Sequence, residues 1–167
     1  MCYLAGVSFA PTNKRTSPAP LYESDPYAWS LRQAELLKAG RLSEIDAENI
    51  AEEILDVGRT EYRILESALR VLLSHMLKWD HQPDKRSRSW ENTILEQRGK
   101  VQRQLRENPS LKARRAEAVR EGYRAARLRA SGETDLDIQN FPEVCPYDWD
   151  AILNRPFRRA EADHGKA

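Results

Sequence analysis

The longest regular pattern of apolar and polar positions in the chain begins at Ala47 and continues to about Trp79. On a helical wheel with about 100° per residue, its apolar positions fall on one side. These positions are Ile50, Ile54, Val57, Ile64, Leu65, Ala68, Leu72, Met76 and Trp79. Because the pattern stays in phase across Gly58, we predict one helix over 47–79, about 50 Å long, whose apolar side packs against the other helices.

Two polar residues interrupt this apolar side. Glu61 lies in its middle and His75 near its edge, about 21 Å apart along the axis, so each needs partners from another helix. Because an unpaired buried charge is costly, we expect cationic partners such as Arg86, Arg88 or Arg98. We expect a buried structural clamp, and a functional site is the alternative. The candidate polar cluster comprises Glu53, Glu61, His75, Arg86, Ser87 and Arg88.

Capping residues and helix breakers predict the remaining helices. The N-terminal caps are Asp25, Ser89 and Asn108. Pro26 and Pro109 follow two of them at the first helical position, where proline is favoured, and Gly132 is a typical stop. The predicted helices lie near 26–39, 47–79, 90–106, 109–130 and 148–153. The predicted fold is therefore an all-α, single-domain helical bundle around one long central helix.

The chain of 167 residues has the usual length of one domain, which we place at residues 21–157. Residues 1–20 end in PTNKRTSPAP, whose three prolines and small polar residues predict a disordered tail. The sequence leaves open whether this tail belongs to the native protein. We predict a frayed tail over residues 158–167.

Charge is distributed unevenly along the chain. The net charge is only +1, but residues 21–84 carry 7 basic and 13 acidic groups, whereas residues 85–130 carry 14 basic and 5 acidic groups. The second segment can neutralise phosphates, or an acidic surface of the same chain or of another subunit. The candidate nucleic-acid-binding residues are Arg98, Arg103, Arg114, Arg115, Arg120, Arg124 and Arg127. Aromatic residues that could stack on bases are scarce there, since only Trp90 and Tyr123 qualify.

No catalytic motif accompanies these charges. A Gly-rich phosphate loop and a dinucleotide fingerprint are missing, and Ser74 and His75 diverge as neighbours on a helix. The long helix carries potential metal ligands, but without the Glu-x-x-His or His-Glu-x-x-His spacing. We therefore predict no metal site and no cofactor. A metal-dependent enzyme using Glu53, Glu61 and His75 is the weakest alternative.

Cysteine usage and hydropathy indicate the compartment. Cys2 and Cys145 are the only cysteines and lie far apart in the sequence, which favours a reduced, cytoplasmic location. No apolar run approaches the roughly 18 residues that cross a bilayer, so we predict no membrane partner. The first ten residues lack the basic leader and apolar centre of a signal peptide.

Five phrases in the chain are similar to those of a known family. They are YESDPYAWSLRQAELLKAGR, AENIAEEILDVGRTE, LRVLLSHMLKW, QPDKRSRSWENTILEQR and FPEVCPYDWDAIL. From Tyr22 to Leu153 the chain resembles the bacterial, all-helical family Domain of Unknown Function 29. The resemblance implies a helical fold and a bacterial origin, and it implies no activity. The recurrent positions of the family correspond to Tyr27, Trp29, Glu53, Gly58, His75, Trp79, Arg86, Ser87, Trp90 and Pro146.

These observations leave three functional hypotheses. The first is a non-catalytic interaction or regulatory module, which associates with itself through its acidic and basic faces or binds another protein. The second is nucleic-acid binding through the basic helices of residues 85–130. The third is the metal-dependent enzyme described above.

Overall fold

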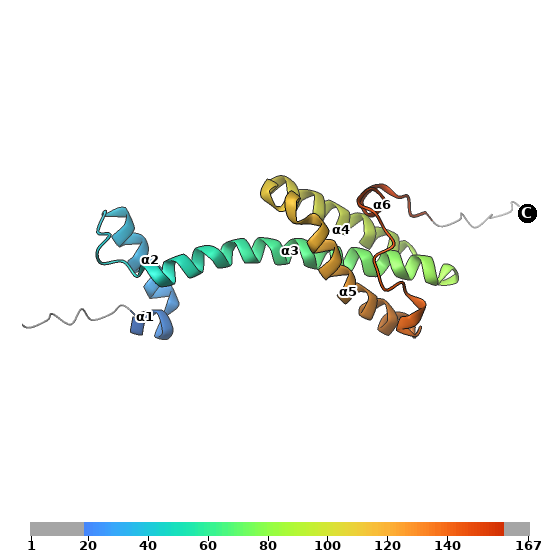
Figure 1. The fold of residues 1–167 in the computed structure, drawn as a ribbon, viewed down its shortest axis with the longest axis horizontal. Coiled ribbons are helices and arrows are strands. Elements are labelled where there is room, and N and C mark those ends of the chain that lie inside the picture. Colours follow the sequence, from blue (N-terminus) through green and yellow to red (C-terminus); the bar gives the residue numbers. More distant parts are fainter. Residues whose placement is uncertain (1–18, 159–167) are drawn as a thin grey trace, which may run out of the picture. The chain divides into compact units, whose positions relative to one another are not determined.

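The computed structural model describes residues 19–158. Within this range the chain forms helices and no strand, which confirms the prediction of an all-α fold with one long central helix (Figure 1). The α-helices are α1 (Ala19–Ser24), α2 (Pro26–Lys38), α3 (Ala47–His81), α4 (Arg88–Glu107), α5 (Arg115–Thr134) and α6 (Trp149–Asn154), and the 3-10 helices are η1 (Pro83–Lys85), η2 (Pro109–Arg114) and η3 (Ile138–Asn140). The predicted tails, 1–20 and 158–167, lie almost entirely outside the described residues.

The chain groups into two compact units, one ending at Asp56 and the other beginning at Val57. The helices α1 and α2 belong to the first unit, α4 to α6 belong to the second, and α3 contributes residues to both. That residues 21–157 behave as one domain stays a prediction.

The first unit begins with the capped helix α2. Asp25 accepts a hydrogen bond from the backbone N–H of Ala28 at 3.0 Å, and Pro26 occupies the first helical position, as the sequence predicts. Trp29 is buried on α2 and donates its ring N–H to Asp46 Oδ2 at 3.3 Å. The preceding helix α1 was not predicted, because a six-residue helix leaves too little periodicity to detect.

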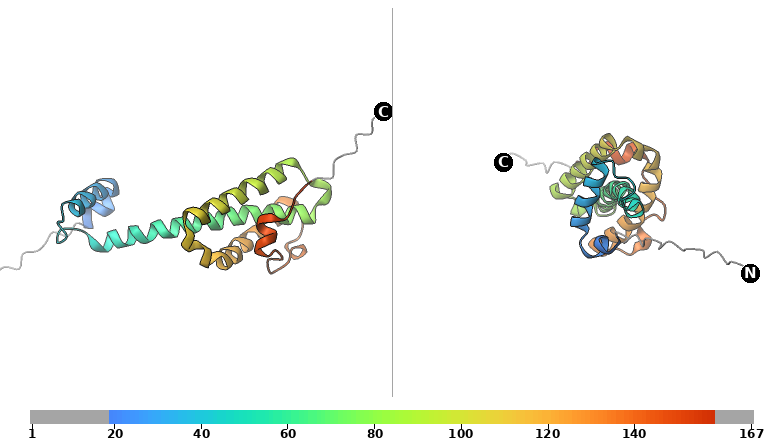
Figure 2. Two further views of the ribbon diagram at one scale, coloured as in Figure 1. Left: turned by 90° about the horizontal axis from the view of Figure 1, so that it is seen from above. Right: turned by 90° about the vertical axis from the view of Figure 1, so that its left-hand side faces the viewer.

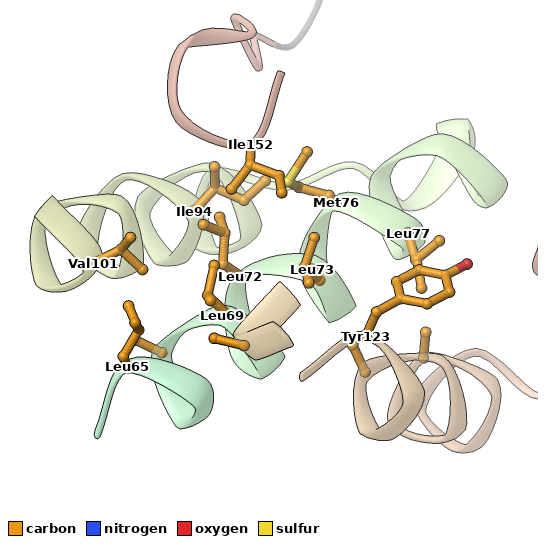
Figure 3. Packing of buried hydrophobic residues seen from close by; sticks show 14 of the residues in the cluster. Leu65, Leu69, Leu72, Leu73, Met76, Leu77, Ile94, Val101, Tyr123 and Ile152 are labelled. Atoms are coloured by element: carbon orange, nitrogen blue, oxygen red, sulfur yellow. The ribbon is translucent and has the colours of Figure 1, made fainter. Parts of the chain in front are cut away.

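The core of the second unit surrounds the C-terminal half of α3. Every residue from Leu72 to Trp79 is buried, so this part of the helix is covered on all sides. Ile94 of α4, Tyr123 of α5 and Ile152 of α6 join the same apolar cluster (Figure 3). Within this unit the end view of Figure 2 shows α3 at the centre, with α4 and α5 on different sides of it.

The helices α3 and α5 approach most closely at Gly122. A Cβ atom at this position would lie 3.2 Å from the backbone N of Arg70 and from the backbone O of Glu66. It would also lie 3.4 Å from Leu69 Cβ. The small residues predicted for the inner side of α5 therefore allow direct backbone contact between the two helices.

The start of α4 differs from the prediction. Ser87, rather than Ser89, is the N-cap, because its hydroxyl oxygen accepts a hydrogen bond from the Trp90 N–H at 3.3 Å. Both serines precede the apolar pattern, and the choice depends on how the chain enters the core. Arg86 donates its Nε–H to the carbonyl of Trp79 at 2.9 Å and holds that entry.

The boundaries of α5 also differ. Pro109 opens the 3-10 helix η2, and the α-helix itself begins at Arg115. At its other end the helix continues past Gly132 to Thr134, which is buried and donates its hydroxyl to the carbonyl of Ala130 at 2.7 Å. Burial of this last turn therefore outweighs the helix-breaking tendency of one glycine.

The apolar side of α3 is exposed over its N-terminal half, so the prediction that it packs along its whole length is wrong. In the first unit Ile54 is 66% exposed. In the second unit Val57 and Ile64 are exposed as well, and burial on α3 begins only at Leu65. The helices α4 and α5 have 20 residues each and cannot cover a helix of 35 residues.

Candidate binding groove

A groove of about 830 Å³ opens in the second unit between α5 and the chain that follows η3. Figure 1 shows that this chain returns beside α5 before it reaches α6. We call the cavity the basic groove. Its lining residues are Lys112, Ala113, Arg115, Ala116, Val119, Arg120, Tyr123, Arg124, Arg127, Glu143, Val144, Cys145, Tyr147, Trp149 and Ile152.

Two side chains of α5 hold the returning chain in place. Arg127 donates its Nε–H to the carbonyl of Phe141 at 3.0 Å and its Nη2–H to the carbonyl of Ile138 at 3.2 Å. Tyr123 donates its hydroxyl to the carbonyl of Pro142 at 2.6 Å, and burial raises the pKa of this phenol to about 12. The wall formed by the returning chain is thus fixed to α5 by neutral and cationic donors that satisfy its carbonyls.

A second anchor ties the returning chain to α3. Asp80 accepts hydrogen bonds from the hydroxyl of Tyr147 at 2.8 Å and from Arg155 Nη1 at 2.8 Å. Burial opposes ionisation of Asp80, but these hydrogen bonds prevail and hold the pKa of its carboxyl below the usual value. Burial and the neighbouring Asp80 carboxylate raise the pKa of Tyr147, so this phenol stays protonated and keeps donating.

The end of the returning chain is fixed by α4. Arg98 is buried and donates its Nε–H to the carbonyl of Ile152 at 2.8 Å and its Nη2–H to the carbonyl of Ala151 at 3.0 Å. Its guanidinium also lies over the ring of Phe157, 5.1 Å from the centroid. Arg98 therefore satisfies carbonyls of the last turns of α6, which explains how a charged residue is stable in the interior.

The lining of the basic groove combines apolar and cationic side chains. Ala116, Val119 and Ile152 contribute aliphatic surface, and Trp149 adds an aromatic side chain. The cations of the lining are Lys112, Arg115, Arg120, Arg124 and Arg127, whereas Glu143 is its single carboxylate. Such a surface attracts an anionic ligand and can bury apolar groups of the same ligand.

The cations of the lining differ in their existing contacts. Arg127 holds the returning chain, and Arg115 donates to the carbonyl of Lys112 at 2.9 Å while lying 5.1 Å from the centroid of the Trp149 ring. Arg120 has a side chain that is 68% exposed and lies 3.5 Å from the carboxylate of Glu121. Arg124 is exposed and forms no ion pair within residues 19–158. The charges of Arg120 and Arg124 are therefore available to a partner.

The seven candidate nucleic-acid-binding arginines divide between two roles. Four of them line the basic groove: Arg115, Arg120, Arg124 and Arg127. The other three lie elsewhere: Arg98 is buried, Arg114 pairs with Glu117 at 2.8 Å, and Arg103 is exposed on α4. The positive charge of residues 85–130 is thus partly structural.

The candidate polar cluster does not assemble in one place. Glu61 accepts hydrogen bonds from Gln104 Nε2 at 2.6 Å and from Asn108 Nδ2 at 3.0 Å, so its partners are amides and not the expected arginines. The pairing of α3 with α4 places the C-terminal turn of α4 beside Glu61, whereas Arg86 and Arg88 lie just before and at the start of α4, at its opposite end.

His75 lies in a separate polar site. Its Nδ1 is 2.9 Å from the carbonyl of Val71, and its Nε2 is 3.4 Å from Lys78 Nζ. Burial lowers the pKa of His75 below its usual value, so the ring is neutral and accepts from Lys78. Lys78 is itself buried, pairs with Glu133 and lies 4.9 Å from the centroid of the Trp90 ring. Lys78 was not among the predicted site residues, although its three-residue spacing from His75 places both on one side of the helix.

The remaining members of the cluster have local roles. Ser87 caps α4, Arg86 binds the carbonyl of Trp79, and Arg88 is exposed on the first turn of α4. Glu53 belongs to the first unit, where it accepts the hydroxyl of Tyr22 at 2.7 Å.

Metal binding and thiol chemistry find little support. Among the described residues no three His, Cys, Asp or Glu side chains are grouped so that they could hold a metal ion. Cys145 lines the basic groove, but burial raises the pKa of its thiol, which disfavours the reactive thiolate.

The comparisons with known proteins give one result. A family model described as Domain of unknown function DUF29 matches residues 21–158. Neither the curated proteins nor the solved structures include a significant match. Between residues 19 and 158, no helix is long and apolar enough to cross a membrane.

Proposed function

The chain belongs to the DUF29 family, and from this premise we propose that it is a non-catalytic interaction module. Its basic groove binds an acidic protein segment that also carries apolar side chains. The family description names no activity, so the proposal depends on the site alone. A cytoplasmic location and a bacterial origin are part of the same proposal.

One observation carries this proposal, the combination of apolar and cationic side chains in the lining of one groove. Val119 and Ile152 offer apolar contact, while Arg120 and Arg124 offer charges that are not used to hold the fold. A purely anionic ligand would leave the apolar part of the lining uncovered, and a purely apolar ligand would leave the charges without partners. An acidic segment with apolar side chains matches both features.

Nucleic-acid binding is the competing function, since the same arginines can contact phosphates and Trp149 can stack on a base. Two features favour the protein partner. Arg115 already lies over the Trp149 ring, and the surface of the groove is mainly apolar. Parallel titrations with an acidic peptide and an oligonucleotide distinguish protein binding from nucleic-acid binding.

The test uses a synthetic helical peptide with a leucine stripe flanked by glutamates, unrelated in sequence to this chain, and titration calorimetry of the full chain. We expect binding that weakens at least about tenfold in the variant R120E/R124E, since about 1.4 kcal/mol corresponds to tenfold. The matched control is R103E/R106E, which makes the same charge change on exposed positions of α4 outside the groove.

Peptide binding that is absent, or equal in wild type and R120E/R124E, would contradict the proposal. A single-stranded oligonucleotide is titrated in parallel. If it binds through Arg120 and Arg124 while the peptide does not bind, the groove is a nucleic-acid site and the interaction module is rejected.

A further inference from the structure

The first unit presents a surface with the opposite chemistry to the basic groove. Residues 44–56, which we call the acidic stretch, contain six carboxylates and no basic residue: Glu44, Asp46, Glu48, Glu52, Glu53 and Asp56. Ile54 and Leu55 of the same stretch are well over half exposed. Exposed apolar side chains of this size within an acidic helix are typical of a surface that binds a partner.

We propose that the acidic stretch of one copy of this chain occupies the basic groove of a second copy. The inference rests on the proposed function of the groove and specifies its partner. Every copy carries both surfaces, so a second copy supplies the required ligand wherever the protein itself is present.

The charges of the two surfaces have matching spacing. On α3 Glu48 and Glu52 are four residues apart, and Leu55 lies three residues further on the same side of the helix. On α5 Arg120 and Arg124 are four residues apart and line the groove together. Two rows with the same spacing and opposite charge can pair along about 6 Å of helix.

The apolar parts of the two surfaces also match in kind. Leu55 lies on the same side of the helix as Glu48 and Glu52, and Val119 lines the groove together with its arginines. Val144, at 79% exposure, lines the other wall of the groove and is available for the same contact. Burial of these side chains supplies affinity, and the charge pairs supply orientation and selectivity.

The test measures self-association of the full chain by sedimentation velocity over a range of protein concentrations. We expect the average mass of the wild type to rise with concentration and to fall when salt is raised from about 50 to about 500 mM, because salt screens exposed charge pairs. R120E/R124E and, separately, E48K/E52K should each weaken association at least about tenfold. The matched control for E48K/E52K is E23K/E35K, which reverses two exposed carboxylates of the first unit outside the acidic stretch.

A charge-exchange experiment distinguishes loss of the interface from failure of a variant to fold. An equimolar mixture of R120E/R124E with E48K/E52K should associate again, because each variant then offers a surface that is complementary to one on the other. The chain that carries all four substitutions should associate by itself. A variant that merely failed to fold would not recover in either sample, so recovery supports the inference.

Three outcomes would overturn the inference. A wild type that stays monomeric while the unrelated acidic peptide binds the groove rejects the second copy and leaves the proposed function standing. If neither R120E/R124E nor E48K/E52K changes association while peptide binding still depends on Arg120 and Arg124, the second copy is likewise rejected and the proposed function stands. If R120E/R124E changes neither association nor peptide binding, the inference and the proposed function both fail.

Discussion

At the scale of single residues, two groups of polar side chains in the second unit satisfy each other within short distances. His75, Lys78 and Glu133 form one such group, and Glu61 with Gln104 and Asn108 forms another. Each member of these two groups has a partner on a neighbouring turn or on the facing helix, which avoids the cost of an unpaired buried charge.

The neutral state of His75 leads to a prediction on pH. Burial lowers the pKa of His75 in the folded protein, and Lys78 adds to this effect. The unfolded chain, with a histidine pKa of about 6.5, therefore binds the proton more readily, and the free energy of unfolding should fall as pH falls below about 6.5. Urea unfolding of wild type and H75Q at about pH 7.5 and about pH 5.5 measures this change in the free energy of unfolding. Both pH values lie above the range in which carboxylates with a lowered pKa titrate.

We expect the free energy of unfolding of H75Q to change less between the two pH values than that of the wild type. The value for H75Q at the higher pH records the packing cost of the substitution alone. Equal changes in both proteins would show that His75 is not the group responsible.

The cap of α4 gives a second prediction at this scale. Ser87 bonds the Trp90 N–H, whereas Ser89 is exposed and lies within the first turn of the helix. S87A should lower the free energy of unfolding by about 0.5–2 kcal/mol, the usual cost of losing an N-cap. S89A should change it by less than about 0.5 kcal/mol. The reverse order in chemical denaturation would mean that α4 begins two residues later, as the sequence pattern alone predicted.

At the scale of helices, the contact of α5 with α3 depends on one missing side chain. G122A places a methyl group 3.2 Å from backbone atoms of Arg70 and Glu66, which cannot move without shifting a helix. We expect it to lower the free energy of unfolding by about 1–3 kcal/mol. G132A lies on the same helix with nothing within 4 Å of its Cβ, and should raise the free energy of unfolding by up to about 1 kcal/mol.

Denaturation of the two variants under the same conditions separates packing from helix propensity, because both exchange glycine for alanine in α5. Similar effects of G122A and G132A would contradict the close approach of the two backbones at Gly122.

The start of a helix could be predicted from the sequence where its signal is local, whereas the basic groove could not be predicted. Asp25 followed by Pro26 specifies the start of α2 within four residues of sequence. The end of α5 depends on burial of Thr134, and the partners of Glu61 depend on how α4 lies against α3, which no local pattern records.

The basic groove could not be predicted for the same reason. Its arginines were visible as a charge excess, but the wall that the returning chain forms depends on contacts such as those of Tyr147 and Arg155 with Asp80, 67 and 75 residues away in sequence. The side of the groove that Val144 and Trp149 provide therefore could not be deduced from spacing along the chain.

At the scale of the whole molecule, the open question of domain number leads to a prediction on cooperativity. The described part of the first unit, residues 19–56, has a small core in which Trp29 and Leu36 are the buried apolar residues of α2. Chains of about 40 residues rarely fold without disulfides or metals, so this unit should depend on α3 remaining helical. Since the core of the second unit stabilises α3, we expect residues 21–157 to unfold as one domain.

The test substitutes Leu72, which is fully buried in the second unit, and observes Trp29 in the first. L72A should lower the free energy of unfolding by about 2–5 kcal/mol. In protein labelled with 5-fluorotryptophan, the fluorine resonances of Trp29 and Trp79 should then report the same lower urea midpoint, because the first unit loses its helix when the second unfolds. The matched control is L95A, which removes the same atoms at a position that is 59% exposed and should leave both midpoints nearly unchanged. A Trp29 midpoint that stays at the wild-type value in L72A, while that of Trp79 falls, would mean that the two units are separate domains joined by a shared helix.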